Sequence, residues 1–151
     1  VYHETEELRL RAKVDEFEIA TRAAGHDWAV FDLTDSFPNW LASQRYAKSY
    51  FQKPNLLSTL LPKYLGYIEA EFDAFLQDKN ISDDFVVALQ GVGSLFGFLK
   101  VKEVVDKLAP KVKGRLLVFF PGSYEDNNYR LLDGYDGWNY LAVPITADKE
   151  F

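Results

Sequence analysis

Two aspartates beside a serine are the first side chains in this sequence with the chemistry of a reactive site. Asp32 and Asp35 follow a short apolar run, and Ser36 comes directly after them. Carboxylates gathered at the end of a strand are typical Mg²⁺ ligands. The same residues are also common at the start of a helix, where Asp35 or Ser36 would cap free N–H groups and Pro38 would occupy the first turn. The sequence leaves both interpretations open.

A second candidate is the glycine-rich stretch QGVGSLFGF, which contains Gly91, Gly93 and Gly97. Its G-x-G-x-x-x-G spacing differs from the G-x-G-x-x-G of dinucleotide-binding folds, and no G-K-[ST] follows it. We therefore expect a glycine turn that lets a loop pack against a sheet.

The third and richest candidate is the polar stretch at 123–139, between the apolar runs LLVFF and NYLAVPI. We expect a long loop after a buried strand, which is where α/β sheets place binding sites. As a recognition loop it would offer hydrogen bonds and stacking area. As a structural brace it would cap its own backbone and pair Arg130 with Asp133 or Asp136. The candidate binding residues are Tyr124, Glu125, Asn127, Asn128, Tyr129, Arg130, Trp138 and Asn139.

A complete catalytic set is missing from these candidates. The two histidines, His3 and His26, are far apart, the chain has no cysteine, and no serine lies in G-x-S-x-G. We therefore predict no catalytic residues, no metal site and no cofactor. The alternative is a Mg²⁺-dependent, nucleotide-handling or phosphoester-cleaving enzyme, which requires Asp32, Asp35 and Glu125 to converge.

The elements that would position these residues alternate between helix and strand. The alternation predicts right-handed crossovers and a parallel sheet. We expect one α/β domain over residues 1–151: a three-layer sandwich whose central, mostly parallel sheet has about five strands, with helices on both faces. The predicted helices are 4–24, 38–51, 56–79 and 101–108, and the predicted strands are Val1-Tyr2 (the end of a truncated first strand), 28–33, 85–89, 116–120 and 139–145.

The charge pattern limits the partners. A net charge of −6 argues against a protein that binds nucleic acid with its whole surface. Residues 100–115 form a local exception with six basic and two acidic side chains. This basic segment could contact DNA or an acidic partner, or it could be an ordinary solvated helix face. The longest apolar run is only a few residues, so no membrane span is expected.

The sequence RLLVFFPGSYEDNNYRLLDGYDGWNYLAVPITA strongly resembles the C-terminal motif of the BrxB family, a small component of BREX phage-defence systems. FEIATRAAGHDWAVFDLTDSFPNWLA and VVALQGVGSLFGFLKV are similar to other parts of that family. The resemblance covers nearly the whole chain, and family members extend further N-terminally. It implies a cytoplasmic protein that works with the methyltransferase, the large ATPase and the phosphatase-like PglZ protein of the same system. It brings no catalytic residues with it.

The residues and the resemblance together predict a non-catalytic adaptor. It would bind another BREX component, PglZ first among them, through the 123–139 segment. Contact with DNA would be only indirect, and a homodimer is left open.

Overall fold

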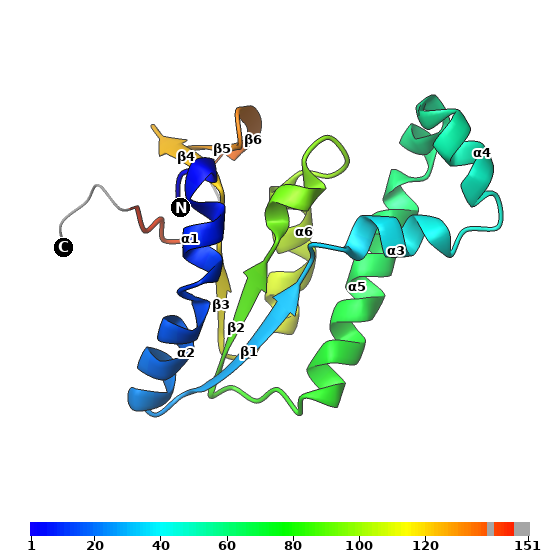
Figure 1. The fold of residues 1–151 in the computed structure, drawn as a ribbon. Coiled ribbons are helices and arrows are strands. Elements are labelled where there is room, and N and C mark those ends of the chain that lie inside the picture. Colours follow the sequence, from blue (N-terminus) through cyan, green and yellow to red (C-terminus); the bar gives the residue numbers. More distant parts are fainter. Residues whose placement is uncertain (139–140, 147–151) are drawn as a thin grey trace.

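The computed structural model describes residues 1–138 and 141–146, and of Trp138 the backbone only (Figure 1). Six strands, six α-helices and four 3-10 helices are assigned within these residues. The strands are β1 Asp27–Asp32, β2 Phe85–Gln90, β3 Arg115–Val118, β4 Gly122–Glu125, β5 Asn128–Leu131 and β6 Gly134–Trp138. The helices are η1 Glu4–Glu6, α1 Glu7–Arg11, α2 Val14–Ala23, α3 Ser36–Ala42, α4 Ala47–Gln52, η2 Pro54–Thr59, α5 Leu61–Asp78, η3 Val92–Leu95, α6 Val101–Leu108 and η4 Ala109–Lys111.

The central sheet is parallel, as predicted, but it is smaller than predicted. Its order is β1-β2-β3, with Trp28 beside Val86 and Val86 beside Arg115. Beyond β3, Tyr2 makes a single parallel bridge with Pro121, and its N–H donates to the carbonyl of Phe120 at 2.9 Å. Val1-Tyr2 thus lies where the end of a first strand was expected. The prediction of about five strands in one sheet is not met, because the sheet has three.

Helices cover both faces of this sheet, as the alternating pattern predicts. On one face, Val87 and Leu89 of β2 join a large cluster with side chains of α3, α5 and α6. On the other face, Trp28 and Ala88 pack with Val14 of α2. Figure 1 shows α1 and α2 on one side of the three strands and α5 and α6 on the other. Successive side chains along β2 point to opposite faces of the sheet, so alternate residues belong to the two clusters.

Several predicted elements have different limits. The 4–24 helix divides at residues 12–13, and the 38–51 helix divides into α3 and α4. In the second case Ser43 Oγ and Gln44 Nε2 both donate to the carbonyl of Trp40, at 2.6 and 3.3 Å. Such side-chain bonds compete with the helix for its own carbonyl and favour its end. The helices around 56–79 and 101–108 agree with the prediction, with Pro62 in the first turn of α5.

The predicted last strand, 139–145, is not a strand over the residues that the structure describes. Asn139 and Tyr140 lie outside them, and 141–146 has no regular structure. Leu141, Val143 and Ile145 are 103%, 85% and 55% exposed, so their alternation is not matched by burial. Alternating apolar residues stabilise a strand only when their face of the strand is buried against another element.

The predicted polar loop is instead a second sheet, antiparallel and ordered β4-β5-β6. Glu125 and Asn128 close the first hairpin around Asp126 and Asn127, whose φ angles are +50° and +65°. Positive φ at both central positions is the signature of a type I′ turn, which fits the twist of paired strands. Asp and Asn are the non-glycine residues that best tolerate it. The polar composition thus belongs to a tight hairpin.

None of the helices within residues 1–138 and 141–146 is long and apolar enough to cross a membrane.

Candidate functional site

The antiparallel sheet presents two chemically different faces. On the inner face Tyr129 and Leu131 are 7% and 2% exposed, and the Tyr129 ring lies 5.4 Å from that of Phe120 in an edge-on contact. Between them Arg130 points outward and is exposed. Its partner across β6 is Tyr135, which is 55% exposed. Burial of the inner row fixes the register, so Arg130 and Tyr135 are presented side by side to solvent.

A β-bulge in β6 places a carboxylate inside the structure. Tyr129 pairs with Gly137 and Arg130 pairs with Tyr135, so Asp136 is an extra residue between two paired positions. A bulge redirects the extra side chain, and here Asp136 is only 3% exposed. Its Oδ1 accepts the N–H of Val101 at 2.7 Å and its Oδ2 accepts that of Lys102 at 2.9 Å. Asp136 therefore caps the first turn of α6, where a negative charge also complements the helix dipole.

This cap brings the residues before α6 next to the outer face of the sheet. The ammonium of Lys100 lies 5.4 Å from the centroid of the Tyr135 ring, a cation–π distance. Phe96 is 43% exposed, and its ring lies against Gly134, where an added Cβ would come within 2.8 Å of Cε2. Phe96, Lys100, Arg130 and Tyr135 together form a surface that we call the platform.

The remaining predicted binding residues fall into two groups: some make hydrogen bonds within the hairpin, and Glu125 is exposed to solvent. Tyr124 donates its hydroxyl proton to Asn127 Oδ1 at 2.9 Å, and Asn128 Nδ2 donates to the carbonyl of Asp126 at 3.0 Å. These contacts stabilise the hairpin, as the brace interpretation expected. Glu125 is exposed at the end of β4. The side chain of Trp138 and the whole of Asn139 lie outside the described residues.

Tyr129 and Arg130 have surroundings that a simple recognition loop does not predict. Burial raises the pKa of the Tyr129 hydroxyl above its ordinary value, with a smaller contribution from Tyr124. A surface partner would reach Tyr129 only by displacing the sheet. Arg130 was expected to pair with the carboxylate of Asp133 or Asp136; in the described part of the chain its guanidinium donates instead to the backbone carbonyl of Asp133. Its outer position remains available to a partner.

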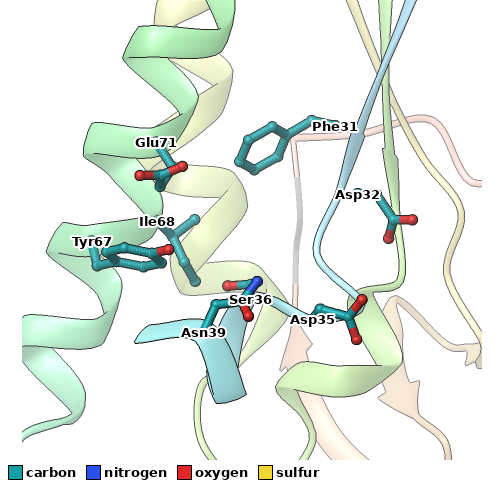
Figure 2. Close-up of a pocket in the computed structure, with 8 residues that line it drawn as sticks. All are labelled: Phe31, Asp32, Asp35, Ser36, Asn39, Tyr67, Ile68 and Glu71. Carbon is teal, nitrogen blue, oxygen red and sulfur yellow. The ribbon is translucent and has the colours of Figure 1, made fainter. Parts of the chain in front are cut away.

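The acidic residues after β1 line a separate cavity of about 300 Å³ (Figure 2). Asp32 and Asp35 lie on the β1 side and Glu71 on the α5 side of this cavity. Asp32 Oδ1 accepts the N–H and the hydroxyl of Thr34 at 2.9 and 2.6 Å. The cavity is lined by Phe31, Asp32, Asp35, Ser36, Asn39, Tyr67, Ile68 and Glu71.

The structure supports neither the helix-cap interpretation nor the Mg²⁺ interpretation of Asp32, Asp35 and Ser36 in the form predicted from the sequence. Asp35 occupies the N-cap position of α3 without a side-chain hydrogen bond to the helix, and Ser36 Oγ lies 2.9 Å from the hydroxyl of Tyr64. The enzyme hypothesis requires Glu125 in this group, and Glu125 does not line the cavity. Across residues 1–138 and 141–146, no three Asp, Glu, His or Cys side chains are placed to hold one metal ion.

The glycine stretch forms the expected turn. Gly91 has a φ of +76° and starts η3, and an added Cβ would lie 2.6 Å from the backbone nitrogen of Thr34. Ser94 Oγ donates toward the carbonyls of Leu33 and Gly91, at 2.8 and 2.7 Å. The turn therefore joins the loops that follow β1 and β2, because only glycine allows so close an approach there.

Ion pairs occupy part of the basic segment at 100–115. Lys102 Nζ bonds Asp106 at 2.6 Å. Lys111 Nζ lies 2.8 Å from Asp73 and 3.2 Å from Glu69, both on α5. Hydrogen bonds to Asp73 and then Glu69 hold the pKa of Lys111 above its ordinary value. These contacts favour the interpretation of this segment as a structural face of α6 and η4.

Lys100, Tyr135 and Asp136 are not among the binding residues predicted from the sequence, although the structure places all three at or beside the platform. A signal for the platform was present, because Tyr129 and Leu131 alternate with Asn128 and Arg130 at the period of a half-buried strand. The role of Asp136 had no local signal, since the helix that it caps begins 35 residues earlier.

Comparisons with known proteins agree with the resemblance noted in the sequence. A family model described as BREX protein BrxB matches residues 40–144. That range contains the platform, the glycine turn and both hairpins of the antiparallel sheet. Searches of curated proteins and of solved structures find no significant match. Because the family model covers more than half of the chain, the protein belongs to the BrxB family of BREX proteins.

Proposed function

We propose that this protein is a non-catalytic assembly component of a BREX defence system, working in the cytoplasm, and that the platform binds another BREX protein. Membership of the BrxB family supports the system. PglZ is the first partner to test, followed by the large ATPase and the methyltransferase. The observation that carries the proposal is the exposed cross-strand pair of Arg130 and Tyr135, with Lys100 against the same ring.

The chemistry of the platform fits a protein interface. Tyrosine, arginine and other aromatic residues supply most of the binding energy at the centre of protein–protein contacts. Phe96, Arg130 and Tyr135 are exposed side chains of this kind on adjoining elements.

The platform is also held in place before any partner arrives. The inner face of β5 is buried, and the hydrogen bonds of Asp136 to the backbone of α6 hold β6 against that helix. A surface that is already ordered loses little conformational entropy on binding, so more of its contact energy contributes to affinity.

The experiment is co-purification of each BREX component with the tagged protein. Arg130→Ala and Tyr135→Ala remove the platform side chains without touching the inner face. We expect each variant to lose at least about tenfold in affinity for the partner, the range of a typical interface anchor. Glu103→Ala is the matched control, an exposed residue of α6 that belongs neither to the platform nor to the candidate binding residues. Retained binding in both platform variants would exclude this surface as the interface.

A further inference from the structure

A helical arm, residues 43–60, extends away from both sheets. Figure 1 shows α4 at the end of the molecule opposite the antiparallel sheet, with the chain returning through η2 to α5. Three large apolar side chains of the arm are open to solvent: Tyr46 is 57% exposed, Phe51 is 63% and Leu56 is 42%. Apolar residues gathered on one projecting element, where the protein's own core does not cover them, mark an interaction surface.

The arm and its flanks also differ in charge from the rest of the protein. Between Asp35 and Glu69 the sequence contains Arg45, Lys48, Lys53 and Lys63 and no acidic residue. This stretch therefore carries +4, and since the whole chain carries −6, the other residues carry −10. A basic, apolar arm on an acidic protein is suited to an acidic surface that has an apolar floor.

The same chain has such a surface at the base of the arm. The cavity after β1 is about 300 Å³ in volume, and the acidic residues Asp32, Asp35 and Glu71 are among those that line it (Figure 2). Phe31, Tyr67 and Ile68 supply its apolar part. An aromatic or lysine side chain is of a size to enter a space of this volume.

We propose that the arm of one copy docks into the acidic cavity of a second copy of this chain. Helix α3 borders the cavity and leads into the arm, and α5 lines the cavity after the arm returns. Two copies related by a two-fold axis exchange arms reciprocally, and each arm–cavity contact occurs twice. This contact lies on different elements from the platform, so it is independent of the proposed function.

A second copy fits the arm better than nucleic acid does. Phosphate groups would use only the three basic side chains of the arm, Arg45, Lys48 and Lys53, with Lys63 beside it on α5, and that number of contacts gives weak, salt-dependent binding. They would leave Phe51 and Leu56 without a partner. The cavity matches both properties of the arm, since acidic residues as well as aromatic and aliphatic ones line it.

The test is a charge exchange followed by sedimentation equilibrium of the full-length protein. Lys48→Glu/Lys53→Glu makes the arm acidic, and Asp35→Lys/Glu71→Lys makes the cavity basic. The wild type should form dimers that weaken as salt rises, because the charge pairs are screened. Each double variant alone should raise the dimer dissociation constant at least about tenfold, because like charges then face each other in both contacts.

An equimolar mixture of the two variants decides the result. In the mixed dimer both arm–cavity contacts again pair opposite charges, so dimers should return to near the wild-type affinity, which a misfolded variant could not achieve. Lys107→Glu/Lys113→Glu, at exposed positions away from the arm, should leave the wild-type dimer unchanged. A wild type that stays monomeric, or a mixture that does not dimerise, would overturn the proposal. So would an arm variant that instead loses binding to a duplex or single-stranded DNA oligonucleotide.

Discussion

The carboxylate of Asp136 accepts the backbone N–H of Val101 at 2.7 Å, although 35 residues separate them in the sequence. This contact joins the antiparallel sheet to α6, the helix that connects β2 and β3 of the central parallel sheet. It depends on a bulge in β6, without which Asp136 would lie in register with β5. One side chain thereby satisfies two N–H groups of α6 and, together with the buried inner face of β5, holds the antiparallel sheet against the rest of the protein.

Replacing Asp136 should destabilise the whole protein. Asp136→Ala leaves the N–H groups of Val101 and Lys102 without these acceptors, and the first of them is buried. We expect a loss of about 1–3 kcal/mol in the free energy of unfolding, measured by urea denaturation. Asp136→Asn keeps one oxygen acceptor and should lose less. Equal stability of the alanine variant and the wild type would show that the cap contributes nothing.

Two glycines should respond to alanine in opposite directions. An added Cβ at Gly122, whose φ is +153°, would overlap the carbonyl oxygen of Arg130 on the neighbouring strand. Gly122→Ala should therefore separate β4 from β5 and cost several kcal/mol, about the range for a severe steric change.

Gly66, inside α5, has no heavy atom within 4 Å of an added Cβ. Gly66→Ala should stabilise the protein by about 0.5–1 kcal/mol, because alanine is the better helix former. Thermal unfolding of the pair checks both signs.

The ion pairs of Lys111 should give a stability that is lost at alkaline pH. Its pKa in the folded protein is raised by Asp73 and Glu69 above the value of about 10.4 in an unfolded chain. The stabilisation is therefore fully present below that value and is lost as the pH rises through the folded pKa. The stability difference between wild type and Lys111→Met should be constant from neutral pH to about pH 9 and shrink above pH 10.4. A difference that does not change with pH would contradict this assignment.

The strands of the central sheet could be predicted from the sequence because local pattern and burial agree there. The run at 85–89 is apolar on both faces, and β2 is the middle strand of a parallel sheet with helices on each side. Helix α6 and the glycine turn at Gly91 were predictable for similar reasons, since periodicity and φ preference act within a few residues.

The antiparallel sheet could not be read in the same way. Polar residues at 125–128 favour a loop by composition, yet Asp126 and Asn127 form a two-residue turn whose outcome depends on strands on either side. The bulge that turns Asp136 inward depends on a helix elsewhere in the sequence. The sequence therefore indicates the segment as a candidate, while its exposed surface and the contact of Asp136 with α6 are seen only in the three-dimensional structure.

The most direct test of the central claim is a binding titration with the double variant Arg130→Ala/Tyr135→Ala. Isothermal titration with purified PglZ, and with the ATPase and methyltransferase in turn, measures affinity, while urea denaturation of the same samples measures stability. We expect the affinity of the double variant for one component to fall about 100-fold or more, while its free energy of unfolding stays within about 0.5 kcal/mol of the wild type. Full-strength binding of every component that the wild type binds would contradict the claim that the platform recognises a BREX partner.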